Sequence, residues 1–134
     1  MSVKEVKLEI DNACHHHVET DPVKLYKKTH DSLGWKVTND CPSDQAVLFC
    51  VYDAKTNNLV DPPPFDPCTS TPPGLTIGTP FTVKSGKHAR LECTGKDEGR
   101  YTKLVLIGGD VPPEGCPPRL PSILTHRLEV EILK

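Results

Sequence analysis

Three consecutive histidines follow a cysteine in the segment Cys14-His15-His16-His17. In an extended chain the side chains alternate between two faces, so His15 and His17 project to one face while Cys14 and His16 project to the other. Two imidazoles at that spacing can share a divalent metal such as zinc or copper, with His16 or Cys14 as further ligands. A closed zinc site needs four ligands, and no C-x-x-C or H-x-x-x-H pattern supplies the others. We therefore expect an exposed polar loop without a cofactor, and a metal site is the alternative.

The six cysteines admit two interpretations. An even number of cysteines in a small proline-rich β protein can mean three disulfides. The N-terminal sequence, however, carries charged residues where the apolar core of a signal peptide would lie, which indicates a cytoplasmic protein with reduced thiols. Reduced thiols are our expectation, and an exported, disulfide-bonded protein whose leader has been removed is the alternative. The cysteines are Cys14, Cys41, Cys50, Cys68, Cys93 and Cys116.

Phe65 is the aromatic residue that does not follow a strand pattern. It lies in the segment DPPPFDPC, where prolines stiffen the chain and reduce the entropy cost of binding. A stiff loop that presents an aromatic ring can contact a partner, so Phe65 is a candidate binding residue. The opposing interpretation is that the ring folds back and anchors its own loop.

Patterns typical of catalysis are missing from the sequence. No G-x-S-x-G elbow and no recognisable cysteine-protease context is present. The pair Gly108-Gly109 opens a proline-rich loop, whereas a phosphate loop requires a following helix N-terminus. An enzyme that uses a loop histidine or cysteine is therefore only the third hypothesis, after a binding module and a metal-binding protein.

The composition indicates a β protein without nucleic-acid or membrane partners. Of the 134 residues, 14 are proline, which argues against a helical protein. The net charge is -2 and no block of like charges suggests binding to a phosphate backbone. No apolar run approaches the roughly 18 to 20 residues that span a bilayer. The length fits a single domain over residues 1–134.

Apolar periodicity predicts the elements that must position these residues. Alternation predicts half-buried strands over 6–10 and 128–132, and residues 46–52 (AVLFCVY) predict a central strand covered on both faces. Further strands are expected over 23–27, 33–37 and 101–107, and a hairpin over 81–93 that turns at Ser85-Gly86-Lys87.

Two proline-rich segments interrupt these strands. Residues 61–80 hold seven prolines and are predicted to form a long surface connection, and a second such loop spans 108–121. About seven or eight short strands with long proline-rich loops predict an all-β, Greek-key β-sandwich.

The segments GWKVTND (34–40) and PFTVKSGKHARLECTG (80–95) resemble the cupredoxin family, whose Greek-key sandwich has a tryptophan strand followed by a hairpin leading to a cysteine. The resemblance covers half of the chain and implies a cupredoxin-like architecture with Cys93 at the position of the copper-binding cysteine. Blue-copper members continue with a histidine and a methionine, and residues 94–100 contain neither. We therefore expect the architecture without the type-1 copper site.

Fold alone does not determine function. The leading hypothesis is a non-enzymatic β-sandwich module of unknown ligand that binds a protein partner, or associates with itself, through its proline-rich loops or a sheet edge. The alternative is a metal-binding protein that uses the cluster from Cys14 to His17.

Overall fold

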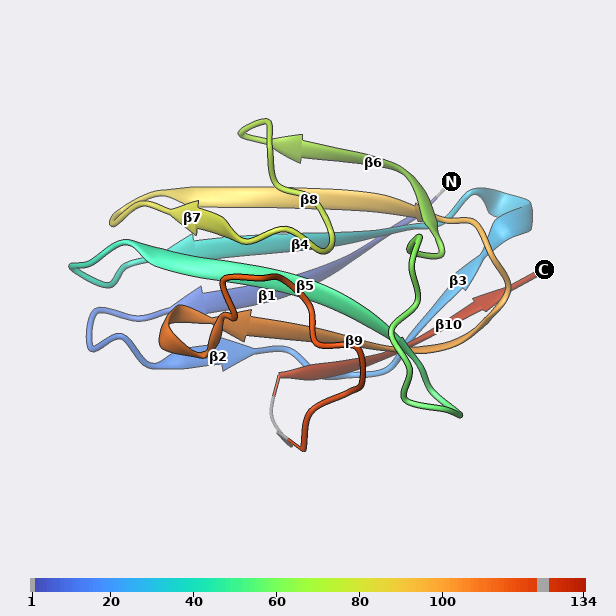
Figure 1. Cartoon of the computed structure of the whole chain (residues 1–134). Helices are drawn as coiled ribbons and strands as arrows, with labels where there is room; N and C mark the ends of the chain where they lie inside the picture. Colours follow the sequence, from blue (N-terminus) through green and yellow to red (C-terminus); the bar gives the residue numbers. More distant parts are fainter. Residues whose placement is uncertain (1, 123–125) are drawn as a thin grey trace.

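The computed structural model describes residues 2–122 and 126–134. Two five-stranded sheets pack face to face, with the order β2-β1-β4-β8-β6 in the first and β3-β10-β9-β5-β7 in the second (Figure 1). The predicted all-β sandwich is confirmed, although the described residues form ten strands instead of seven or eight. No helix in this part of the chain is long and apolar enough to cross a membrane.

Most neighbouring strands are antiparallel, but β1 pairs in parallel with β4 and β3 pairs in parallel with β10. The first sheet contains β1 (Val3–Ile10), β2 (His16–Val18), β4 (Ser32–Asn39), β6 (Phe65–Thr71) and β8 (His88–Gly95). The second contains β3 (Val23–Tyr26), β5 (Gln45–Asp53), β7 (Phe81–Val83), β9 (Gly99–Ile107) and β10 (Arg127–Leu133). Two short 3-10 turns are η1 (Lys27–Thr29) and η2 (Gly108–Asp110).

The main core lies between the sheets and follows the alternation in the sequence. In β1, Val6, Leu8 and Ile10 are buried while their neighbours face solvent, and β10 repeats this pattern. Trp35 of β4 packs on Phe49 of β5 with the ring centroids 5.1 Å apart, which joins the two sheets at the centre. The strands predicted from alternation near both ends of the chain are therefore confirmed.

A second, smaller core lies on the outer face of the second sheet. There the outward side chains of β5 and β9 are buried beneath the loop of residues 108–121, which crosses in front of these strands in Figure 1. Cys50 of β5 is bonded to Cys116 of this loop, and the Tyr52 hydroxyl donates a hydrogen bond of 2.9 Å to the Pro117 carbonyl. The prediction that β5 is covered on both faces is confirmed, because the second proline-rich loop provides the outer cover.

The first proline-rich segment contains a strand, contrary to the sequence prediction. Residues 65–71 form β6, which pairs with β8 at the edge of the first sheet. Pro67 is tolerated because an edge strand needs only one side of its backbone for pairing, and the register shifts between Phe65 and Cys68. The predicted hairpin is also wrong, since β7 pairs with β5 in the second sheet while β8 pairs with β4 and β6 in the first.

All six cysteines form disulfides, so the expectation of reduced thiols is wrong. Cys68 and Cys93 lie directly opposite each other in the register of β6 and β8, which places their sulfurs within bonding distance. The sequence could not show this register, because the pairing of β6 was itself not predicted. The bonds are Cys14–Cys41, Cys50–Cys116 and Cys68–Cys93.

Candidate functional site

The sandwich has two sides on which the chain crosses from an edge strand of the first sheet to an edge strand of the second. On one side, β2 leads to β3 through residues 19–22; we call this side the histidine edge, formed by residues 7, 9, 16–20, 126 and 127. On the opposite side, β6 leads to β7 through residues 72–80; we call it the uncharged edge, formed by residues 67–83. These two edges are the candidate sites for binding.

The histidine edge contains an open pocket of 790 Å³. Among the described strands, β2 pairs only with Leu8 to Ile10 of β1, and β3 pairs only with Val130 to Leu133 of β10. No described strand therefore lies beside the beginning of β10 on that side, which leaves the pocket open. The charged side chains that line the pocket are Lys7, Glu9, Glu19 and Arg127. The pocket therefore has a mixed-charge wall beside its histidines.

His16 and His126 meet in this pocket, although one belongs to β2 and the other precedes β10 in the opposite sheet. Nδ1 of His16 lies 3.5 Å from Nε2 of His126, and the ring centroids are 5.6 Å apart with the planes inclined at 60°. Burial, and then the proximity of His16, lowers the pKa of His126. The pair therefore favours the neutral form of the His126 imidazole.

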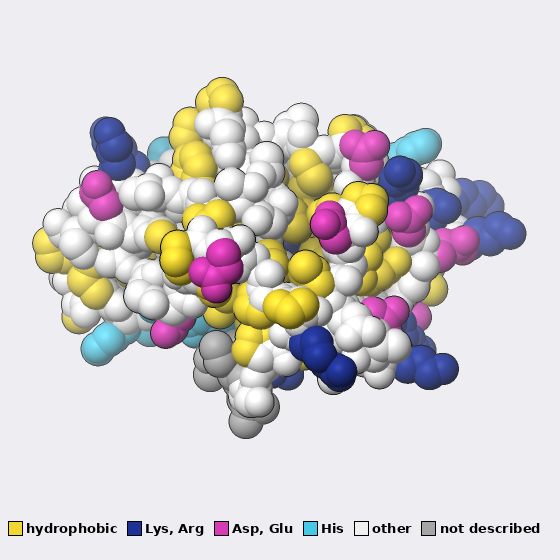
Figure 2. Space-filling view, in the orientation of Figure 1, with side chains coloured by type: hydrophobic (Ala, Val, Ile, Leu, Met, Phe, Trp, Pro, Cys, Tyr) yellow, Lys and Arg dark blue, Asp and Glu magenta, His cyan; other side chains and the backbone are white. Residues whose placement is uncertain are grey.

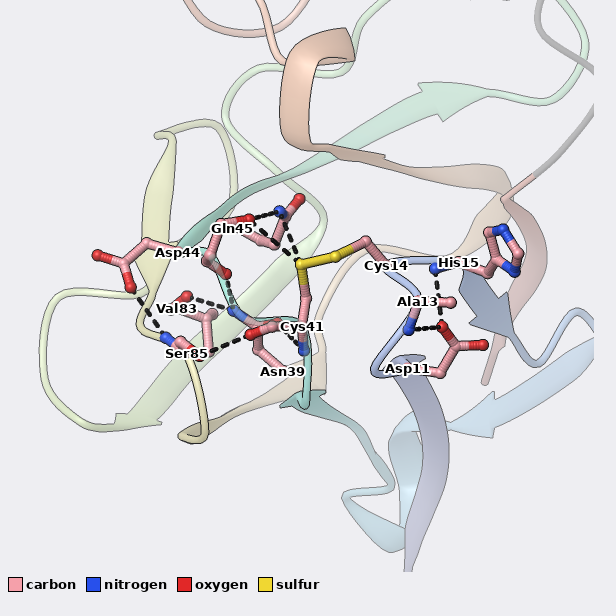
Figure 3. Close-up of a disulfide and its surroundings, with 11 residues drawn as sticks. Asp11, Ala13, Cys14, His15, Asn39, Cys41, Asp44, Gln45, Val83 and Ser85 are labelled. Carbon is pink, nitrogen blue, oxygen red and sulfur yellow. Dashed lines mark hydrogen bonds between the residues drawn. A yellow bond between two sulfur atoms is a disulfide. The ribbon is translucent and has the colours of Figure 1, made fainter.

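Asp11 organises the turn between β1 and β2. Its Oδ1 accepts hydrogen bonds of 2.9 Å from the backbone N–H groups of Ala13 and His15, as Figure 3 shows. Its Oδ2 lies 2.9 Å from Nε2 of His17. The hydrogen bond with His17, followed by that from His15, lowers the pKa of Asp11 to about 2. His17 is therefore held by a carboxylate and is directed away from His16, its neighbour along the strand.

Cys14 cannot act as the thiolate ligand proposed from the sequence. Its sulfur is bonded to Cys41, which ties the turn after β1 to the turn after β4 (Figure 3). Of the four predicted ligands, only His16 meets a further histidine, and that partner, His126, was not assigned from the sequence. Within residues 2–122 and 126–134, no three His, Cys, Asp or Glu side chains are grouped to hold a metal ion.

The uncharged edge has the opposite chemistry. From position 67 to 83 the only residue with a titratable side chain is Cys68, and its sulfur is in a disulfide. A pocket of 290 Å³ with a mainly apolar lining opens between Pro72, Phe81 and Ala89, with Lys84, Lys87 and His88 also in its wall. Figure 2 shows hydrophobic and uncharged atoms at the top of the view, where the chain leaves β6.

Phe65 does not extend this surface toward a partner. It is buried, with 5% of its surface exposed, and packs in the main core. The ring therefore anchors the start of β6, which corrects its assignment as an exposed binding residue and agrees with the opposing interpretation.

Lys103 is a buried group that the sequence analysis missed. It is fully buried in β9, and its ammonium group lies 5.1 to 5.4 Å from the ring centroids of Trp35, Phe49 and Phe65. Burial lowers the pKa of Lys103 to about 7, and Nζ has no hydrogen-bond partner among the described residues. The signal was present in the alternation of YTKLVLI, which places Lys103 on the same face as the inward-facing Val105.

No known family matches the chain, and no curated protein matches it in sequence. Two solved structures are similar to the chain at low sequence identity. Auracyanin B, a cupredoxin, matches with a TM-score of 0.46 and 12% identity over 99% of this chain and 89% of that chain. A multicopper oxidase from Campylobacter jejuni matches with a TM-score of 0.40 and 11% identity over 100% of this chain and 30% of that chain.

The residues present do not fit the copper site of blue-copper cupredoxins. Cys93, which the sequence resemblance places at the copper-binding position, is bonded to Cys68. A disulfide sulfur lacks the thiolate charge that ligates such a metal. We therefore derive no role for a thiolate-bound copper ion.

Proposed function

We propose that this protein is a non-enzymatic β-sandwich module that associates with a second copy of itself through the uncharged edge. In this association, β6 of each copy adds to β6 of the other, so that the two first sheets become continuous. The observation that carries the proposal is the open side of Cys68–Thr71, an edge segment without an ionisable side chain.

The backbone of β6 supports strand addition. Residues 68–71 pair with β8 on one side, and no other described strand lies on the opposite side. A row of unpaired N–H and C=O groups is a template for another extended segment. Pro67 and Pro72 bracket the template, and because proline has no N–H to donate, they limit the added pairing to about four residues.

The lack of charge on residues 68–71 of β6 favours a second copy as the partner. When two identical strands pair about a two-fold axis, an ionisable side chain close to the axis lies near its own equivalent and is repelled by it. Thr69, Ser70 and Thr71 instead offer hydroxyl groups that can hydrogen-bond across such a pair. By contrast, Lys4 and Glu5 lie in the half of β1 that β2 leaves uncovered, where charge opposes pairing.

The disulfides also support a proposal for the compartment in which this association takes place. Three disulfides in a small domain are typical of proteins that fold under oxidising conditions. We therefore propose an oxidising compartment, which is the exported alternative of the sequence analysis rather than the cytoplasmic expectation.

Sedimentation velocity over a range of protein concentrations tests the proposal. We expect the wild type to change from monomer to dimer as its concentration increases, with a weak association because a four-residue contact buries less than about 1,000 Å². The variant Thr69→Lys should stay monomeric. Its fold should be retained, since position 69 lies opposite Glu92 of β8 and the new ammonium group gains an opposite charge.

The matched control is Asn12→Lys, which adds the same charge in the exposed turn after β1, on the other side of the sandwich. This variant should dimerise like the wild type. A wild type that stays monomeric at millimolar concentration, or a Thr69→Lys variant that dimerises equally well, would overturn the proposal.

A further inference from the structure

The geometry points to a binding site for a late first-row divalent metal ion, such as Zn²⁺, Ni²⁺ or Cu²⁺, between Nδ1 of His16 and Nε2 of His126. This site lies at the histidine edge and is independent of the association proposed for the uncharged edge. It differs from the pair His15 and His17, which spacing alone suggested as the alternative to an exposed polar loop, because His16 lies in β2 of the first sheet and His126 directly precedes β10 of the second.

The separation of the two nitrogens suits a shared metal better than a direct hydrogen bond. They lie 3.5 Å apart. Two nitrogens that each bind zinc at about 2.0 to 2.1 Å with a tetrahedral angle lie about 3.3 to 3.4 Å from each other. A direct hydrogen bond from a ring N–H is usually about 2.7 to 3.2 Å long. A small adjustment of either ring therefore gives the geometry of two metal ligands.

The surroundings leave room for the remaining ligands. The open pocket of 790 Å³ admits water to the space beside the two rings. Glu9 and Glu19 line the same pocket and offset the charges of Lys7 and Arg127, so the wall carries no excess of positive charge against a cation. We therefore assign two imidazole ligands, with water in the other positions.

A metal at this position would join the two sheets. β2 is held to β1 by only three paired residues, and the metal would tie this short strand to the beginning of β10. A ligand that binds only the folded protein raises its melting temperature as the ligand concentration passes the dissociation constant. The Irving–Williams order predicts that Cu²⁺ binds more tightly than Ni²⁺ or Zn²⁺.

Thermal unfolding of the disulfide-bonded protein, without an affinity tag, tests the site. ZnCl₂ and NiCl₂ should raise the melting temperature of the wild type, and EDTA should reverse the shift. The shift should be lost in His16→Gln and in His126→Gln. It should persist in the matched controls His15→Gln and His17→Gln, which remove the neighbouring imidazoles. An unshifted wild type, or equal shifts in His16→Gln and the wild type, would overturn the assignment.

Histidine C2–H signals in the NMR spectrum of the wild type give a second measurement that needs no variant. Addition of Zn²⁺ should move or broaden the signals of His16 and His126 before those of His30 and His88, which are exposed elsewhere. Simultaneous changes in all four signals would indicate non-specific binding and would refute the site. The metal response should also persist in Thr69→Lys, which separates it from self-association.

Discussion

At the histidine edge, the chain passes from the first sheet to the second through residues 19–22, between charged side chains and histidines. At the uncharged edge, it makes the equivalent crossing through residues 72–80, between prolines, glycines and hydroxyl side chains. Charge and a very short strand protect the first edge from pairing with other chains, whereas prolines and a cross-strand disulfide restrict the second. A β-sandwich can therefore restrict pairing at both edges by different means, and in our proposal only the uncharged edge remains compatible with an identical strand.

The two edges also differ in the pH range over which they affect stability. The carboxylate of Asp11 supports the turn beside the histidine edge. Because its pKa is lowered, the stability that it contributes changes in the acid pH range. Lys103 packs against the ring of Phe65, the first residue of β6, in the core beneath the uncharged edge. Because its pKa is lowered, its effect on stability changes in the neutral to alkaline pH range. Substitutions near the histidine edge should therefore change the free energy of unfolding at acid pH, and substitutions beneath the uncharged edge should change it at neutral to alkaline pH.

The largest expected effect comes from Lys103→Met. The pKa of this lysine falls from an ordinary value of 10.5 to about 7 in the folded protein, so between these values the unfolded chain binds a proton that the folded protein lacks. The free energy of unfolding of the wild type should therefore rise with pH by up to about 1.4 kcal/mol per pH unit. The variant should lose this slope and gain about 4 kcal/mol at pH 7.

Urea unfolding from pH 6 to 9.5 measures both effects. Burial raises the pKa of Tyr52 from 10.0 to about 12, so this tyrosine affects stability only above about pH 10, where the unfolded chain begins to lose its proton. The control is Lys36→Met, which removes an exposed lysine from β4 and should keep the wild-type slope. Parallel profiles for the wild type and Lys103→Met would contradict a neutral buried lysine.

A smaller effect is expected from removing the disulfide beside each edge. Cys14–Cys41 and Cys68–Cys93 span similar sequence separations, 27 and 25 residues, so loss of either bond should lower the free energy of unfolding by about 3 to 4 kcal/mol. Only the double variant C68A/C93A should accelerate hydrogen exchange in residues 68–71, because it removes the covalent link that supports the backbone pairing of β6 with β8. Urea unfolding combined with exchange measured by NMR distinguishes the two variants. Equally fast hydrogen exchange of residues 68–71 in C14A/C41A would contradict this prediction, because it would show that loss of a disulfide beside the histidine edge also destabilises β6.

The smallest effect is expected from Asp11→Ala. The pKa of Asp11 is lowered from 3.8 to about 2, so its contribution is complete above the higher value and is lost as the pH falls through the lower one. The variant should melt slightly below the wild type at neutral pH and should lose less stability on acidification. Melting curves from pH 2 to 6 test this, with Glu114→Ala as the control for an exposed carboxylate in another loop. An unchanged acid profile would show that the turn does not depend on this side chain.

Local patterns in the sequence predicted the strands well. Alternation identified β1 and β10, and the continuous apolar run identified β5, because burial on one face or two faces leaves a direct pattern along the chain. Proline density misled the prediction for β6, since the side on which an edge strand pairs is decided by the rest of the sheet. The buried position of Lys103 was visible in the alternation, but lysine is rarely buried and was not considered a core residue.

Contacts between distant segments could not be predicted in the same way. The spacing of His15 and His17 suggested a shared face, but Asp11 engages His17 and the opposite sheet brings His126 to His16. The disulfide pairs likewise depend on strand register and loop position, neither of which is contained in a single segment. The sequence therefore indicated the fold and one candidate cluster, while the contact between His16 and His126 and the open edge emerged only from the packing of the sheets.

The bond between Cys68 and Cys93 has a further consequence for how two copies can exchange. Domain swapping requires an edge strand to leave its own sheet and enter that of a neighbour. While the disulfide is intact, β6 remains covalently attached to β8, so in the oxidised protein β6 alone cannot move into the sheet of another molecule. In the proposed dimer, two copies therefore lie side by side and can separate without unfolding. We expect subunit exchange to be rapid in the oxidised protein and to gain a slower, swapped route only after reduction.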